Sequence, residues 1–240
     1  MRPLTEILEQ VQAVIAERCA KCGRSPDEVK ILGVTKTFGP EVVREAWDAG
    51  ITVCAENKVQ EAIWKIPESP SQLSWHLIGH LQRNKVRAAV ELFQMIHSVD
   101  SVRLLETIEA CSEESGARPE ILLEVNTSGE SSKFGLKPEE VPEVIERAME
   151  CRNVTLSGFM TMAPFATEME SARPFFRRLR ELRDEMESLY GIGLPELSMG
   201  MSGDYPVAVE EGATLVRLGT VLFGERPKFK IIRAANDDEI

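Results

Sequence analysis

The sequence predicts an α/β fold, a single (β/α)8 TIM-type barrel with an extra N-terminal helix, from three observations. Short apolar runs alternate with stretches of helical periodicity along most of the chain, as in strand–helix units. Eight such units fit into 240 residues at about 30 residues each, the usual size of one unit of a closed barrel. No G-x-G-x-x-G follows the first strand, which disfavours the alternative, an open doubly wound sheet.

Local patterns define each element in turn. Apolar residues at helical spacing predict an amphipathic helix over residues 4–21, and Gly23 is a suitable stop. Apolar runs predict strands at 30–35, 51–55, 74–78, 95–99, 121–125, 154–160, 196–199 and 214–218. Each strand precedes a helical pattern or a tight loop, and the unit after the seventh strand is a short helix over 205–211. No Gly-, Ser- or Pro-rich linker divides the chain, so we expect residues 1–240 to form a single domain.

Composition excludes several classes of function. The net charge is −11, the pI is about 5.0 and no basic tract is present, so we expect no nucleic-acid partner. No apolar run approaches the roughly 20 residues of a membrane helix. The N-terminal segment also lacks the apolar core of a signal peptide. We therefore expect a cytoplasmic protein without a membrane partner.

The sequence gives no convincing metal site. Cys19 and Cys22 form a C-x-x-C, but no second pair follows at the spacing of a zinc site, and five cysteines are an odd number for a disulfide framework. His76 and His80 are spaced H-x-x-x-H without a third ligand. We expect no metal, and we interpret His76 as a hydrogen-bonded interior histidine near the mouth of the barrel.

Lys36 is the first candidate for chemistry, because it lies at the carboxyl end of the first predicted strand. In parallel α/β folds this end of the strands is where ligands bind. A lysine there can lose solvent contact, lower its pKa and attack a carbonyl group as a neutral amine. The alternative is a solvated lysine at the start of a loop, and spacing alone leaves both open.

The ends of the last two strands resemble an anion-binding region. Barrels often bind phosphate with the loops after strands seven and eight, where small residues let backbone N–H groups approach an anion. The residues of this kind here are Ser198, Gly200, Ser202, Gly219 and Thr220. The alternative is two ordinary turns with N-caps.

A lysine facing a phosphate site suggests a phosphorylated carbonyl compound, and pyridoxal 5′-phosphate (PLP) fits. Arg217 lies three residues before Thr220 and could point at the ring nitrogen of PLP. Two positive charges repel, so an arginine there would keep that nitrogen unprotonated and make the ring a poor electron sink. The alternative for Arg217 is a salt bridge at the end of the core.

Several motifs, taken in order, resemble those of the pyridoxal-phosphate homeostasis protein family, whose members look like the alanine racemase N-terminal domain standing alone. They are residues 34–37 (VTKT), 56–61 (ENKVQE), 75–79 (WHLIG), 81–85 (LQRNK), 197–202 (LSMGMS) and 216–220 (VRLGT). The resemblance implies PLP as cofactor, a Schiff base at Lys36, Asn57 beside the cofactor and Arg217 near its ring nitrogen. It implies phosphate contacts from Ser198, Met199, Gly200, Ser202, Gly219 and Thr220. Lys133, in the loop after the fifth strand, is interpreted as a loop lysine.

The resemblance implies intracellular PLP homeostasis or carriage without substrate turnover, so we assign no catalytic residue. The alternative is a PLP-dependent amino-acid racemase, which needs acid/base groups on both faces of its substrate. Related racemases take the second group, a tyrosine, from an additional β domain, and this chain has only Tyr190 and Tyr205. A third possibility is an aldolase that acts on a phosphorylated sugar through Lys36. We expect a monomer whose partners are PLP and PLP-requiring apo-enzymes.

Overall fold

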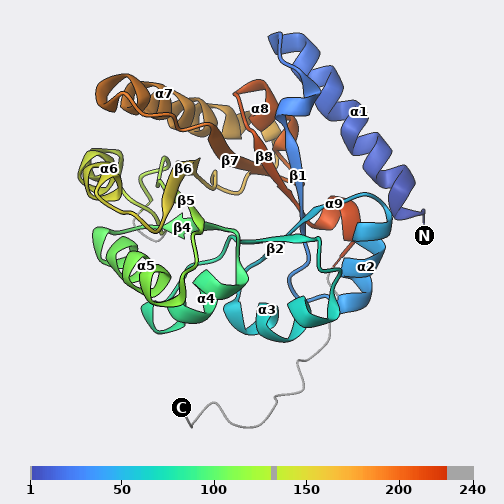
Figure 1. The fold of residues 1–240 in the computed structure, drawn as a ribbon. Helices are drawn as coiled ribbons and strands as arrows, with labels where there is room; N and C mark the ends of the chain where they lie inside the picture. The colour runs from blue at the N-terminus through green and yellow to red at the C-terminus, as the bar shows by residue number, and fades with distance from the viewer. Residues whose placement is uncertain (1, 131–133, 226–240) are drawn as a thin grey trace.

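The structure is a computed structural model that describes residues 2–130 and 134–225. Its centre is a closed barrel of parallel strands in which each strand pairs with the next along the chain and β8 pairs with β1, so the predicted fold class is confirmed (Figure 1). The strands are β1 (Lys30–Val34), β2 (Val53–Glu56), β3 (Ser74–Leu77), β4 (Met95–Val99), β5 (Glu120–Glu124), β6 (Thr155–Met160), β7 (Glu196–Met201) and β8 (Leu215–Leu218).

The helices surround this barrel in Figure 1. They are α1 (Leu4–Cys22), α2 (Pro40–Asp48), α3 (Val59–Lys65), α4 (Val86–Leu92), α5 (Val102–Ser115), α6 (Val141–Met149), α7 (Arg173–Tyr190), α8 (Tyr205–Glu210) and α9 (Thr220–Phe223). Short 3-10 turns lie at Pro26–Glu28, Ile66–Glu68, Arg83–Lys85, Pro138–Glu140 and Met169–Ala172. No helix in the described part of the chain is long and apolar enough to cross a membrane.

The extra N-terminal helix is present as predicted. The buried residues of α1 recur every three or four positions, at Leu4, Leu8, Val11, Ile15 and Cys19, so one stripe faces the barrel. This stripe packs against α8 and α9, which places α1 beside the units that close the barrel (Figure 1). Gly23 ends the helix with a φ of 71°, a left-handed conformation that glycine adopts without strain.

Side chains alternate between two hydrophobic cores, as the period of a β-strand requires. The larger core lies between the strands and the helices. The smaller core fills the barrel interior and is built from Leu32, Val34, Ala55, Met95, Leu122, Met160 and Leu215. This alternation determines which polar residues point inward: on each strand, they lie an even number of residues from a residue of the interior core.

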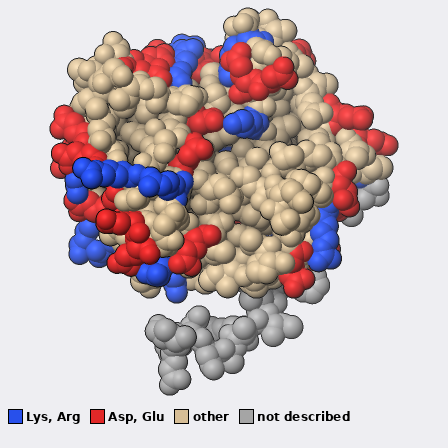
Figure 2. Space-filling model, in the orientation of Figure 1, with Lys and Arg blue, Asp and Glu red and all other residues tan. Residues whose placement is uncertain are grey.

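Charge on the surface follows the acidic composition. On the face shown in Figure 2, acidic side chains are spread around the rim and basic ones lie among them. The helices carry ion pairs of this kind, for example Arg87 with Glu114 at 2.7 Å. Such exposed pairs contribute little to stability individually.

Candidate functional site

A cavity of about 580 Å³ lies at the carboxyl ends of the strands, where the sequence predicts a ligand site. Its walls come from loops that follow strands far apart in the sequence, including those after β1, β2, β3, β6, β7 and β8. Of the predicted residues, the cavity is lined by Lys36, Asn57, Ser202, Arg217, Gly219 and Thr220. We call it the mouth cavity.

Three predicted residues, Ser198, Met199 and Gly200, do not line this cavity. The predicted seventh strand ends too early, because β7 continues to Met201 and places all three inside the strand. Ser198 points into the barrel below the mouth, whereas Met199 is buried in the core between strands and helices. Gly200 has a φ of 89°, and a Cβ atom there would lie 2.6 Å from the Cβ of Ala208, so only glycine fits.

Lys36 lies two residues after Val34 and four after Leu32, both of which point into the barrel. Its half-buried side chain lines the mouth cavity. The next residue, Thr37, has a φ of 71° and is the one non-glycine residue of the described ranges with a positive φ. This conformation is unfavourable for a β-branched residue. Glu61 holds it, because its Oε2 atom accepts a hydrogen bond of 2.8 Å from the Thr37 backbone N–H.

A buried ion pair supports the same loop from below. The Nζ atom of Lys65, whose side chain is completely buried, donates to the Thr35 carbonyl at 2.9 Å and to Glu56 at 2.6 Å. The Thr35 hydroxyl donates to the same Glu56 oxygen at 2.7 Å. Burial raises the pKa of Glu56, and the charge of Lys65 opposes this shift. Glu56 is therefore a structural partner of Lys65 and Thr35.

The loops after β7 and β8 meet as predicted. The Ser202 hydroxyl oxygen accepts hydrogen bonds from the backbone N–H groups of Gly219 at 3.3 Å and Val221 at 3.2 Å. These contacts join the end of β7 to the start of α9 and bring Ser202, Gly219 and Thr220 to one side of the mouth cavity. Hydroxyl and amide donors at one wall suit an anion such as phosphate.

Hydrogen bonds inside the barrel fix the orientation of the Arg217 guanidinium. Its Nη1 atom donates to the Ser198 carbonyl and hydroxyl oxygens, both at 2.7 Å, and Nη2 donates to the Thr161 carbonyl at 2.9 Å. Burial lowers the pKa of Arg217 to about 10, and the charges of Asp204 and Glu124 act against that shift. The guanidinium therefore keeps its positive charge at neutral pH and presents it to the mouth cavity.

Sequence reasoning missed Glu124, the last residue of β5, which lines the same cavity. Burial raises its pKa to about 7, Asp100 raises it further and Arg217 opposes the shift. The signal in the sequence was the alternation Glu120, Leu122, Glu124, which places a carboxylate on the inward face.

His97 was also missed, and His76 lies elsewhere than predicted. His76 is a hydrogen-bonded interior histidine, but it lines a second cavity at the opposite end of the barrel, because it comes near the start of β3. His80 does lie at the mouth, where it stacks on Phe134 with ring centroids 4.2 Å apart and pairs with Asp100 at 3.2 Å. Lys133 lies outside the described residues.

Neither tyrosine reaches the mouth cavity. Tyr205 is buried in the core between strands and helices, and Tyr190 on α7 donates its hydroxyl to Glu146 at 3.0 Å. In the described part of the chain, the acid/base groups that line the cavity are Lys36, His80, Glu124, Glu168 and Asp204.

Comparisons with known proteins point in one direction. The family model of the alanine racemase N-terminal domain matches residues 12–227. A pyridoxal phosphate homeostasis protein of Aquifex aeolicus is 44% identical over 224 residues, which cover 93% of this chain and 96% of the relative. One from Homo sapiens is 37% identical over 238 residues, which cover 93% of this chain and 85% of the relative.

Solved structures agree with this result. PipY of Synechococcus elongatus, solved with PLP bound, superimposes with a TM-score of 0.78 at 38% identity and covers 88% of this chain and 100% of PipY. An alanine racemase of Clostridium difficile superimposes with a TM-score of 0.73 at 16% identity and covers 94% of this chain but 57% of the racemase. At that identity the racemase shows a shared fold only.

Proposed function

Because this chain belongs to the pyridoxal phosphate homeostasis protein family, we propose that it binds PLP as a Schiff base on Lys36 in the mouth cavity. We further propose that it serves intracellular PLP homeostasis or carriage, with PLP-requiring apo-enzymes as recipients, rather than turning over a substrate. One observation carries the proposal: Lys36, Arg217 and the two small-residue loops border a single cavity of about 580 Å³.

The residues present fit the chemical groups of PLP. Lys36 supplies the amine for the aldehyde, and Asn57 lines the same cavity. Ser202 and Thr220 would hold the phosphate through their hydroxyl groups, and Gly219, which has no side chain, would let the phosphate approach the backbone between them. Bound PLP supplies an aldehyde carbon for imine chemistry and a pyridine ring for electron withdrawal.

Arg217 favours carriage over catalysis. Its guanidinium remains charged, and its hydrogen bonds to Ser198 and Thr161 leave it no freedom to move away from the cavity. A fixed positive charge beside the pyridine nitrogen disfavours protonation of that nitrogen. The ring then withdraws electrons weakly, which suits holding the cofactor better than stabilising a carbanion.

The amino-acid racemase remains the second candidate, and one observation favours it. Glu124 lines the cavity with a pKa of about 7, which is in the range of a general acid or base. Against it, neither Tyr190 nor Tyr205 lines the mouth cavity. Incubation of purified holo-protein with L-alanine, followed by chiral analysis, decides between the two. We expect no enzyme-like formation of D-alanine, and steady turnover would establish the racemase instead.

The binding site itself is tested by absorbance and mass. We expect the purified protein to show the near-ultraviolet or visible band of a PLP Schiff base, and Lys36→Ala to lose it, since the variant lacks the amine that forms the bond. Lys58→Ala, which removes a nearby exposed lysine outside the cavity, is the control and keeps the band.

Borohydride reduction followed by peptide mass analysis identifies the adduct. The expected result is a pyridoxyl phosphate mass on the peptide that contains Lys36. A sugar phosphate mass on the same lysine would establish the aldolase alternative, and an unmodified Lys36 in a protein that retains its band would refute the proposed attachment site.

A further inference from the structure

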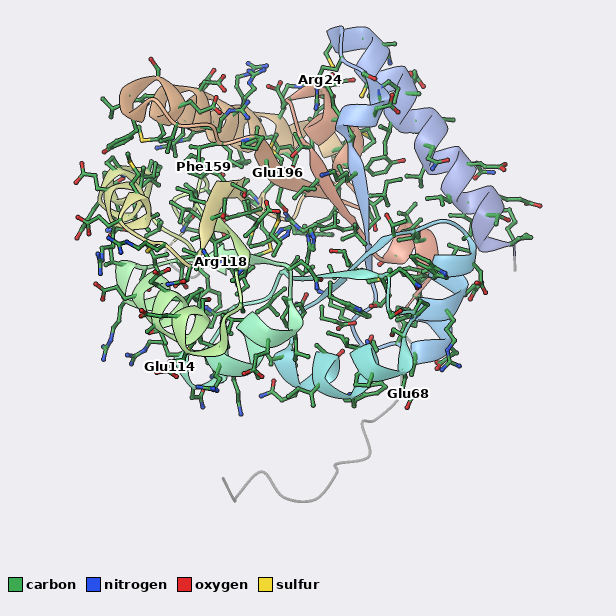
Figure 3. The ribbon with its side chains drawn as sticks, viewed as in Figure 1. Arg24, Glu68, Glu114, Arg118, Phe159 and Glu196 are labelled. Carbon is green, nitrogen blue, oxygen red and sulfur yellow. The ribbon has the colours of Figure 1, made fainter. Side chains whose placement is uncertain are left out.

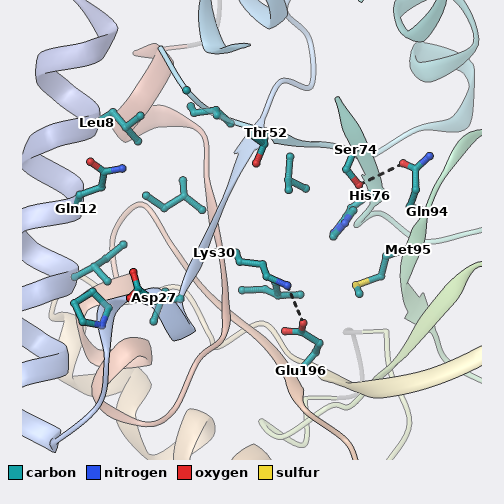
Figure 4. A pocket seen from close by; sticks show the side chains of 18 of the residues that line it. Leu8, Gln12, Asp27, Lys30, Thr52, Ser74, His76, Gln94, Met95 and Glu196 are labelled. Atoms are coloured by element: carbon teal, nitrogen blue, oxygen red, sulfur yellow. Dashed lines mark hydrogen bonds and ion pairs between the residues drawn. The ribbon is translucent and has the colours of Figure 1, made fainter. Parts of the chain in front are cut away.

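A second cavity, of about 780 Å³, lies at the opposite end of the barrel, where the strands begin. It is bordered by the starts of the strands and by α1 (Figure 4). Its charged residues are Asp27, Lys30, Glu120 and Glu196. Glu196 lies in the middle of the molecule at the start of β7, whereas Glu68 and Glu114 lie at the periphery (Figure 3). The proposed function does not use this cavity, which we call the base cavity.

The floor of the base cavity contains a polar side chain that lacks one partner. His76 is 7% exposed and lines the cavity. Its Nδ1 atom is hydrogen-bonded to Nε2 of His97 at 3.0 Å. Within the described residues, no hydrogen-bond partner is found for its other ring nitrogen, Nε2.

The direction of the hydrogen bonds determines what His76 presents. Arg217 can only donate, so the Ser198 hydroxyl oxygen accepts from it. Ser198 is completely buried, and within the described residues the acceptor found for its hydroxyl proton is Nδ1 of His97, 2.8 Å away, so we assign the proton to that hydrogen bond. His97 then carries its proton on Nε2 and donates to Nδ1 of His76. His76 is left with an N–H at Nε2, and this donor faces the base cavity.

Both histidines are neutral at physiological pH, so this arrangement is stable. Burial lowers the pKa of His76 to about 3, and the nearby charge of Lys30 lowers it further. Burial also lowers the pKa of His97, as do His76 and Arg217. Lys30 and His76 both line the base cavity (Figure 4).

Most of the charged residues that line the base cavity are acidic. Lys30 pairs with Glu196 at 3.4 Å, whereas Glu120 accepts a hydrogen bond from Ser157 at 2.6 Å and has no cationic partner within the described ranges. Three carboxylates against one ammonium would repel a simple anion. A simple cation would leave the His76 N–H without an acceptor.

We propose that the base cavity binds a small zwitterion of the α-amino-acid class. The carboxylate accepts hydrogen bonds from His76 and Lys30, and the ammonium group lies between Glu120 and Glu196. This arrangement satisfies the unpartnered donor and the unpaired carboxylate together, which neither half of the zwitterion does alone.

Binding is tested by calorimetry on protein treated with borohydride, in which an amino acid cannot form an imine at the mouth cavity. The probes are L-alanine, propionate, which lacks the ammonium group, and ethylamine, which lacks the carboxylate. We expect saturable binding of L-alanine and none of the other two. The proposal fails if L-alanine does not bind, or if propionate or ethylamine binds equally well.

Variants locate the site. We expect Lys30→Met and Glu196→Gln each to weaken L-alanine binding about tenfold, since each removes one charged hydrogen bond. Lys30 is largely exposed and its replacement does not threaten the fold. Glu113→Gln, on the outer surface of α5, is the matched control and leaves the affinity unchanged. Unchanged affinity in both cavity variants would overturn the assignment.

The same hydrogen-bond chain connects the two cavities, because Arg217 at its far end lines the mouth cavity. This connection, unlike the base site itself, rests on the proposed function. We expect L-alanine to shift the absorbance of the reduced pyridoxyl group in the parent protein. Binding without any shift in the parent protein would refute the connection and leave the base site intact.

Discussion

At the scale of single residues, Glu124 shows how the barrel interior changes ordinary chemistry. Glu124 is 4% exposed, and the pKa of its carboxyl group is about 7 in the folded protein, compared with an ordinary value of 4.5. Between these two values the folded protein keeps a proton that the unfolded chain has lost. Stability therefore decreases as the pH rises through this window.

This shift predicts the behaviour of Glu124→Gln. The variant stays neutral, so it avoids a penalty on the order of 3 kcal/mol that the parent has accumulated above pH 7. We expect urea unfolding of cofactor-free protein to show the variant more stable at about pH 8 and nearly equal to the parent at about pH 5. Glu113→Gln controls for loss of surface charge, and a constant difference across pH would contradict the raised pKa.

At the scale of elements, the loop after β1 depends on α3. Thr37 has an unfavourable φ of 71°, and the fixed positions of Glu61 and Lys65 on α3 hold its N–H and the carbonyl of Thr35. Strained backbone conformations of this kind persist only where contacts with the surrounding structure hold them in place. Lys36 lies between these two anchors, so α3 decides where its amine points.

Glu61 is therefore predicted to be a positioning residue for PLP. We expect Glu61→Ala to weaken PLP binding about tenfold, because the loop relaxes and the amine of Lys36 moves from its place. Glu61→Gln retains an acceptor oxygen and is expected to restore most of the affinity. The measurement is absorbance titration of cofactor-free protein with PLP. Equal loss in both variants would point to the charge of Glu61 rather than to its hydrogen bond.

At the scale of the whole molecule, a charge cluster fastens the last units of the barrel. Glu211, which follows α8, is 5% exposed at its side chain and pairs with Arg173 at 3.0 Å and Arg177 at 2.9 Å, both on α7. The neighbouring Glu210 pairs with Arg18 of α1 at 2.8 Å. Segments from both halves of the chain thus meet at the end of α8.

Glu211 is expected to stabilise the folded protein except in acid. Burial raises its pKa, but the hydrogen bonds and charges of Arg177 and Arg173 outweigh burial, so the net pKa is lowered. Its contribution is present above the unfolded pKa and is lost as the pH falls through the folded one. We expect Glu211→Gln to lose about 2 kcal/mol of unfolding free energy at pH 7.

Denaturant unfolding measured at several pH values checks this prediction. The difference between Glu211→Gln and the parent should shrink as the pH falls below about 4, where glutamate in the unfolded chain is protonated. Glu139→Gln, on an exposed turn outside the cluster, is the control. A difference that stays constant into acid would show that the charge of Glu211 is not what stabilises the molecule.

Sequence alone predicted the path of the chain because periodicity is a local property. The eight strands and α1 lie where the apolar patterns place them, and Lys36, Asn57, Ser202, Arg217, Gly219 and Thr220 border one cavity as strand ends in a barrel should. The end of β7 was misjudged because the polar run after Leu197 resembles a loop, although its alternation continues the strand to Met201.

Tertiary structure alone decided which interior groups meet. The chain from His76 through His97 and Ser198 to Arg217 crosses four strands, so it depends on barrel closure and on the register between strands. The complete burial of Lys65 depends likewise on Thr35 and Glu56 lying above it. Local sequence determines which face of the sheet a side chain occupies, because side chains along a strand alternate between the two faces. Contacts across the barrel instead depend on residues far apart in the sequence, which only folding brings together.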